Sequence, residues 1–109
     1  MEMDLTPIAD ERLLCVKVSK IARENIYEMT RKYWKLDGCK AAEADYVLAV
    51  IDGIVDSVFE PDEWFKTEDP AHTGRWEFIG RPVNESPYIG KSVKSFYGRS
   101  ANPVRYINF

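Results

Sequence analysis

The sequence predicts a small α+β fold: a small curved antiparallel or mixed sheet, or a small β-barrel, covered by one main helix and one short helix. Three observations predict it. The elements follow the order strand, helix, hairpin, strand, short helix, strand; an Asp-Gly pair separates two apolar runs; and an apolar stripe at helical spacing precedes that pair. The length of 109 residues fits a single domain over residues 1–109.

The first part of the chain predicts a lead-in, a strand and the main helix. Residues 1–11 are a polar lead-in, and the apolar run after them predicts a strand over residues 13–18. Ser19 is placed to cap a helix over residues 20–34, because its hydroxyl can accept a hydrogen bond from a free backbone N–H group. Gly38 is a stop signal for this helix. The apolar stripe of the helix consists of Ala22, Ile26, Met29 and Tyr33.

The clearest local signal is a hairpin over residues 46–59. Asp52 and Gly53 lie between two apolar runs, and an Asp-Gly pair favours a two-residue turn because both turn positions need a positive φ. The first strand is apolar on both faces, so we expect it to be central in the sheet and covered on both sides. This turn predicts pairing of Ile51 with Ile54, Val50 with Val55 and Tyr46 with Phe59.

The segment after the hairpin predicts a loop and another strand. Pro61 is expected to end the hairpin, and residues 60–73 read as a long, acidic, irregular loop. Residues 75–79 alternate in polarity and predict a strand, with Trp76 and Phe78 on one face.

The carboxy-terminal part predicts a short helix and a final strand. We expect the helix over residues 91–97, with Gly98 as its cap, and the strand over residues 104–109. An open edge on that strand could pair two chains, so the expected state is a monomer or a homodimer.

Four segments carry a resemblance to a known group of proteins. Residues 46–53, 76–80, 88–92 and 102–109 resemble small uncharacterised bacterial and phage domains, a pattern that is similar to the PUA-like superfamily with its ASCH and EVE domains. The resemblance covers about residues 44–109 and implies a PUA-like β-barrel. It also implies binding of RNA, or of modified bases in DNA, without catalysis by the module itself.

Charge is distributed unevenly along the chain. The formal net charge is −3, yet residues 1–73 sum to −7 and residues 74–109 to +4. The basic part is suited to an anionic partner, or it pairs with the acidic part inside the fold.

Cysteine usage and the start of the chain point to a cytoplasmic location. Cys15 lies in an apolar run, where we expect it to be buried, and Cys39 follows Gly38 in an expected loop. Two cysteines are not a disulfide framework for a domain of this size. The first residues are acidic and lack a secretory signal pattern, and no apolar stretch is long enough to span a membrane.

No motif of an enzyme, a cofactor site or a metal site emerges. His72 is the single histidine, so neither a zinc site nor a catalytic pair is indicated. Gly90-Lys91-Ser92 is similar to the end of a phosphate-binding loop, but the position that needs a glycine is Glu85. A weaker hypothesis places an anion at the start of the short helix, beside Ser92, where backbone N–H groups would be free.

The favoured function is a non-catalytic nucleic-acid-binding module for RNA or modified DNA. Basic residues mixed with aromatic ones suit single strands, because bases stack on rings while Lys and Arg contact phosphates. The alternative is a protein-interaction or regulatory module that acts on a nuclease or another partner, and a small enzyme is the third possibility. The candidate phosphate contacts are Arg75, Arg81, Lys91, Lys94, Arg99 and Arg105, and the candidate stacking residues are Trp76, Tyr88 and Tyr97.

Overall fold

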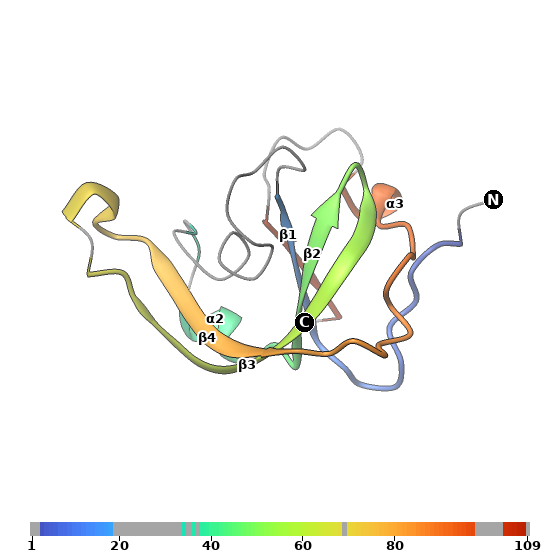
Figure 1. Cartoon of the computed structure of the whole chain (residues 1–109), viewed down its shortest axis with the longest axis horizontal. Helices are drawn as coiled ribbons and strands as arrows, with labels where there is room; N and C mark the ends of the chain where they lie inside the picture. Colours follow the sequence, from blue (N-terminus) through green and yellow to red (C-terminus); the bar gives the residue numbers. More distant parts are fainter. Residues whose placement is uncertain are drawn as a thin grey trace.

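The protein is a small α+β fold built on one five-stranded mixed sheet (Figure 1). The computed structural model describes residues 3–18, 34, 36, 38–68, 70–97 and 104–108. The strands are β1 (Leu13–Lys17), β2 (Tyr46–Ile51), β3 (Ile54–Lys66), β4 (Trp76–Pro82) and β5 (Val104–Ile107). The helical segments of the described residues are α2 (Gly38–Ala41), α3 (Lys94–Tyr97) and the 3-10 turn η1 (Pro70–His72).

The strands follow the order β4-β3-β2-β1-β5. β1 runs parallel to β2, and the other three neighbouring pairs are antiparallel. The prediction of a mixed sheet is therefore confirmed, and so is the central place of β2. The described strands form an open sheet and do not close into a barrel.

Each face of the sheet carries its own apolar core, because side chains alternate along the central strands. Val47 and Ala49 of β2 face one core, and Leu48 and Val50 face the other. The first core also includes Leu14, Val16, Ala41, Phe59, Phe78 and Val104. The second includes Leu5, Leu13, Cys15, Val55, Val58, Tyr88, Val93, Tyr97 and Ile107.

The Asp-Gly hairpin forms as predicted, but its register shifts along the strands. Asp52 and Gly53 have φ angles of 52° and 81°, and Ile51 pairs with Ile54. An irregularity between Ala49 and Val50 then offsets the ladder by one residue. As a result Phe59 pairs with Val47, and the predicted pair of Tyr46 with Phe59 is wrong. The offset places Phe59 and Val47 in the same core.

Pro61 does not end the hairpin, which corrects the predicted loop over residues 60–73. β3 continues to Lys66 and pairs with β4 along this whole stretch. The ladder tolerates Pro61 because the register shifts between Pro61 and Glu63, and a bulge is a place where a strand can hold a residue that lacks an N–H donor. The irregular part is limited to the segment between β3 and β4 that contains η1.

Gly80 allows the two strands to approach each other across this bulge. It pairs with Pro61, and a Cβ atom at position 80 would lie 2.3 Å from the Glu60 carbonyl oxygen and 2.9 Å from Pro61 Cα. We expect Gly80→Ala to destabilise the protein by about 2–3 kcal/mol, because backbone atoms must move to admit the methyl group. Urea denaturation measures this loss.

Gly74→Ala is the matched control for this prediction. Gly74 has a φ of 84° but nothing within 4 Å of a Cβ atom, so its substitution costs only backbone strain, about 1 kcal/mol. A loss at Gly80 no larger than the loss at Gly74 would contradict the close approach.

The lead-in is docked against the core on one face of the sheet. Ser92 donates its N–H to the Met3 carbonyl at 2.7 Å and accepts from the Leu5 N–H at 2.8 Å. Leu5 is buried in that core, and the Tyr88 hydroxyl donates to Glu11 Oε1 at 2.6 Å. The lead-in is therefore attached to the sheet through backbone hydrogen bonds and the buried Leu5.

Of the two predicted helices, the structure describes only the short one. The helix over residues 20–34, with its Ser19 cap, lies outside the described residues except for Trp34, which forms a bridge to Trp76. The short helix begins three residues later than predicted, at Lys94, and its expected cap Gly98 is also outside. Among the helices of the described residues, none is long and apolar enough to cross a membrane.

Gly38 begins α2, and the helix that it was predicted to stop lies outside the described residues. A Cβ atom at this position would lie 2.2 Å from the Trp76 ring, so the ring packs directly on the Gly38 backbone.

Both cysteines are free thiols, and Cys39 lies in helix α2 and not in the predicted loop. Cys15 is buried and Cys39 is exposed. Burial raises the pKa of the Cys15 thiol to about 12.

Candidate anion-binding site

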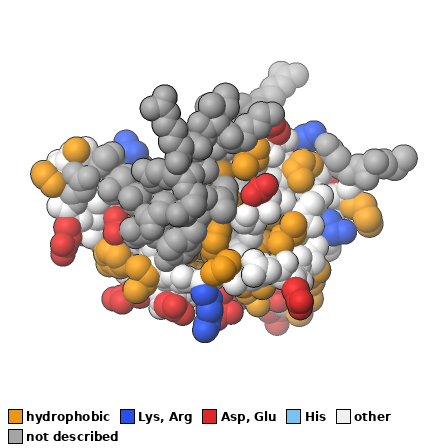
Figure 2. All heavy atoms as spheres, viewed as in Figure 1, with side chains coloured by type: hydrophobic (Ala, Val, Ile, Leu, Met, Phe, Trp, Pro, Cys, Tyr) orange, Lys and Arg blue, Asp and Glu red, His pale blue; other side chains and the backbone are white. Residues whose placement is uncertain are grey.

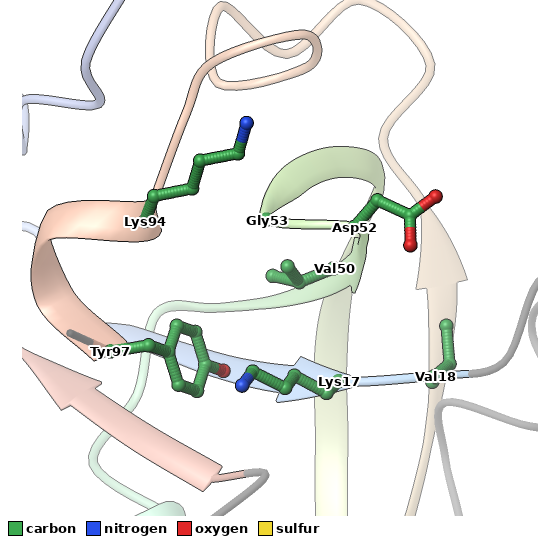
Figure 3. A pocket seen from close by; sticks show the side chains of 7 residues that line it. All are labelled: Lys17, Val18, Val50, Asp52, Gly53, Lys94 and Tyr97. Carbon is green, nitrogen blue, oxygen red and sulfur yellow. The ribbon is translucent and has the colours of Figure 1, made fainter. Parts of the chain in front are cut away.

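A cavity of about 410 Å³ lies where the parallel strands β1 and β2 end. Its lining includes Lys17 and Val18 after β1, Val50 of β2, the Asp52-Gly53 turn, and Lys94 and Tyr97 of α3 (Figure 3). The carboxyl ends of parallel strands are a common place for ligands, because the connections there leave a crevice. The volume falls within the range of small-molecule sites.

Two lysines reach this cavity from different elements. Lys17 is exposed at the end of β1, and Lys94 is exposed at the start of α3. The Lys94 side chain runs past the turn, since a Cβ atom on Gly53 would lie 2.4 Å from Lys94 Cγ. Gly53 thus supplies both the positive φ of the turn and the room for this lysine.

A third cation is held beside the same cavity by Tyr97. The Lys17 ammonium nitrogen lies 4.3 Å from the centre of the Tyr97 ring, and Arg105 Cζ lies 5.9 Å from it. Arg105 pairs with Cys15 across β1 and β5, which places it on the same face of the sheet as Tyr97. Both contacts fall within the range of a cation–π interaction. We call Lys17, Lys94, Tyr97 and Arg105 the Tyr97 site.

The Tyr97 site carries a local surplus of positive charge in a protein whose formal net charge is −3. Lys17 and Arg105 lie at the Tyr97 ring, Lys17 and Lys94 line the cavity, and Asp52 is the only acidic side chain among the described residues of that lining. Figure 3 shows the Asp52 carboxylate pointing away from the Lys94 ammonium group. Like charges held close together favour the binding of an anion between them.

Tyr97 itself stays protonated at ordinary pH. Burial raises the pKa of its hydroxyl well above the usual value of 10, Cys15 raises it further, and Arg105 opposes the shift. The ring therefore acts as a neutral platform that positions Lys17 and Arg105.

The structure brings together only part of the predicted site. Tyr97 lies beside Arg105 and lines the same cavity as Lys94, whereas Arg75, Trp76 and Arg81 lie on or beside β4. Arg99 is outside the described residues. The Arg81 guanidinium donates to Glu60 at 2.8 Å and lies 3.9 Å from Asp62, so its charge is already compensated.

The predicted stacking residues are already packed against the protein. Tyr97 and Tyr88 are buried, with exposed fractions of 4% and 3%. Trp76 lies on Gly38 and has the Lys66 ammonium nitrogen 5.8 Å from its ring centre. These contacts leave phosphate recognition, and not base stacking, as the chemistry available at the Tyr97 site.

The anion hypothesis at the start of the short helix is wrong. Ser92 is buried, and the backbone N–H groups from Gly90 to Lys94 all have acceptors within the protein. Lys91 lines a separate cavity of about 250 Å³ beside the lead-in, with its ammonium nitrogen 3.7 Å from Met3 Sδ.

No protein-family model matches the chain, and no curated protein or solved structure matches it either. The proposed function is therefore based on the residues of the Tyr97 site and their geometry. Within the described part of the chain, no group of three or more His, Cys, Asp or Glu could hold a metal ion.

Sequence reasoning missed Lys17. The signal was present, because a strand–helix–strand order predicts a parallel pair, and the carboxyl ends of such a pair meet at one edge. Lys17 follows the first apolar run and Asp52 follows the second, so both could have been placed at that edge.

Proposed function

We propose that the chain is a non-catalytic module that binds nucleic acid through its phosphate groups at the Tyr97 site. The observation that supports the proposal is that Lys17 and Arg105 lie at the Tyr97 ring while Lys17 and Lys94 line the cavity beside it. Phosphate contacts of this kind fix a nucleic acid in place without reading its sequence. The resemblance of residues 44–109 to PUA-like modules supports the same proposal.

The test is a fluorescence-anisotropy titration with single-stranded and duplex RNA and DNA oligonucleotides at two salt concentrations. We expect the affinity to fall with salt, with a log–log slope of roughly −2 for three phosphate contacts on a single strand. We also expect the double substitution of Lys17→Glu and Lys94→Glu to weaken binding at least about tenfold, because it replaces two attractions with two repulsions.

Lys66→Glu is the matched control for Lys17→Glu and for Lys94→Glu, each measured singly, since it makes the same charge change at the far end of β3. If Lys66→Glu weakens binding as much as either substitution in the Tyr97 site, the overall charge and not this site is responsible. Binding that ignores salt would refute phosphate contacts, and no binding at low salt would favour the protein-interaction alternative.

A further inference from the structure

The cavity beside Tyr97 has a buried wall and a charged opening. Val50 and Tyr97 line it with exposed fractions of 1% and 4%, so they form its inner wall. Lys17, Lys94 and Asp52 line it too, and their side chains are exposed, which places them at the opening. Figure 2 shows that acidic side chains are spread over the visible face of the protein, so a cavity with two lysines differs from its surroundings.

The described lining does not suit a row of consecutive bases. Grooves that bind single strands along their length present aromatic rings on which successive bases stack. Tyr97 is the one aromatic residue among the described residues of the lining, and Lys17 and Arg105 already lie 4.3 Å and 5.9 Å from its ring centre. The cavity therefore favours the phosphate end of a nucleotide over the bases of a passing strand.

The two lysines of the lining favour an anion that carries more than one charge. In Figure 3 the Lys94 ammonium group lies on one side of Val50 and the Lys17 ammonium group on the other. Each ammonium group is carried on a flexible four-carbon stem, so both can turn toward one bound anion. A phosphate monoester carries a charge of about −1.5 to −2 at pH 7, whereas a phosphate within a strand carries a single charge. The monoester therefore gains more from this pair of lysines.

Asp52 is the acidic group of the described lining that a phosphate must avoid. Its carboxylate points away from the Lys94 ammonium group in Figure 3. Asp52 occupies the turn with a φ of 52°, a conformation that asparagine also tolerates. The charge at this position can therefore be removed without loss of the turn, which gives a variant of opposite sign to a lysine substitution.

We propose that the cavity takes the terminal phosphate monoester of a single strand of nucleic acid. The proposal rests on the proposed function and names the part of the nucleic acid that enters the site. A volume of about 410 Å³ is in the range of sites for small molecules, so it suits a terminal phosphate with part of its own nucleotide, while the rest of the strand stays outside. A free mononucleotide carries the same group, and the experiment separates the two sources.

The test is a competition titration in which unlabelled single strands displace a fluorescent, phosphorylated strand from the full chain. Strands of one sequence carry a phosphate at the 5′ end, at the 3′ end or at neither. We expect one of the phosphorylated strands to bind at least about fivefold more tightly than the strand with hydroxyl ends, because its extra charge meets two lysines. A nucleoside monophosphate should compete more weakly, since it lacks the other phosphates of a strand.

Variants of the lining test where the terminal phosphate lies. Lys17→Gln should reduce the preference for the phosphorylated strand to below about twofold, because one of the two attractions is lost. Lys66→Gln is the matched control, since Lys66 is also exposed and also lies near an aromatic ring, 5.8 Å from the centre of Trp76. Asp52→Asn should tighten the binding of the phosphorylated strand. Circular dichroism of each variant checks that the fold is kept.

Each contrary result has its own meaning. Equal binding of phosphorylated and hydroxyl-ended strands, with an affinity that still falls with salt, would overturn this inference and leave the proposed function in place. A monophosphate that competes as well as the phosphorylated strand would assign the cavity to free nucleotides. Weaker binding by Asp52→Asn, or an unchanged preference in Lys17→Gln, would show that the terminal phosphate lies elsewhere. Failure of every strand to bind would remove the proposed function as well.

Discussion

Replacing Phe78 by alanine is expected to lower the free energy of unfolding by about 3–5 kcal/mol. Phe78 is fully buried, lies against Trp64, and belongs to the same core as Phe59 and Ala41 of α2. Its removal leaves a cavity that the paired strands β3 and β4 cannot readily close, because their ladder fixes the distance between them. Since small domains are stable by about 5–15 kcal/mol, this single change should bring the protein close to unfolding.

Ile79→Ala is the control for that measurement. Ile79 is the next residue on β4, but its side chain points to the opposite face of the sheet and is 43% exposed, so we expect a loss below about 1 kcal/mol. Urea denaturation of both variants gives the comparison. Similar losses for Phe78→Ala and Ile79→Ala would show that these two side chains do not lie on a buried and an exposed face of β4.

The second large effect is a loss of stability at alkaline pH. In the unfolded chain the Cys15 thiol ionises with a pKa near 9.0, whereas in the folded protein burial raises that pKa to about 12. Between these values the unfolded state releases a proton that the folded state keeps, so stability is complete below pH 9 and falls as the pH rises toward 12. The full effect of Cys15 is on the order of 4 kcal/mol.

Two tyrosines add to this loss in the same direction. Burial, followed by the hydrogen bond to Glu11, raises the pKa of Tyr88 from 10.0 to about 12, and burial raises that of Tyr97 as well. Their contribution begins above pH 10, later than that of Cys15.

Urea denaturation at pH 8 and pH 10 isolates the thiol. The background should be Cys39→Ala, because the exposed thiol of Cys39 would otherwise react at high pH. Adding Cys15→Ala should lower the stability at pH 8 and flatten its fall between pH 8 and pH 10. An unchanged slope in that variant would mean that Cys15 is not the group whose ionisation is linked to folding.

The features that depend only on neighbouring residues were predicted correctly from the sequence. The Asp52-Gly53 turn, the strand over residues 13–18 and the burial of Cys15 follow from patterns within a few residues of each other, and the structure confirms them. The offset that moves Phe59 opposite Val47 depends on how two strands share a core, which no local pattern encodes. The same is true of Pro61, which is accommodated by the register shift beside it and by Gly80, which faces it from another strand.

The candidate site shows the same division. The sequence shows that Tyr97 is aromatic and that Arg105 is basic. Their contact, however, depends on how β1, β5 and α3 pack together. The burial of Tyr88 and Tyr97 could not be predicted, because a tyrosine in the sequence does not tell whether its ring faces solvent or a core. The role of Lys17 was not predicted, because in the sequence this residue only marks the end of the apolar run before it.

The position of β5 has a consequence for synthesis of the protein. β1 lies between β2 and β5, and β5 is the strand that leaves the ribosome after all the others. Until then one edge of β1 has no partner among the described strands, and the fully buried residues Leu13 to Val16 remain next to an open ladder. Unpaired strand edges recruit other chains, so nascent chains stalled before residue 104 are the species that we expect to aggregate and to engage chaperones.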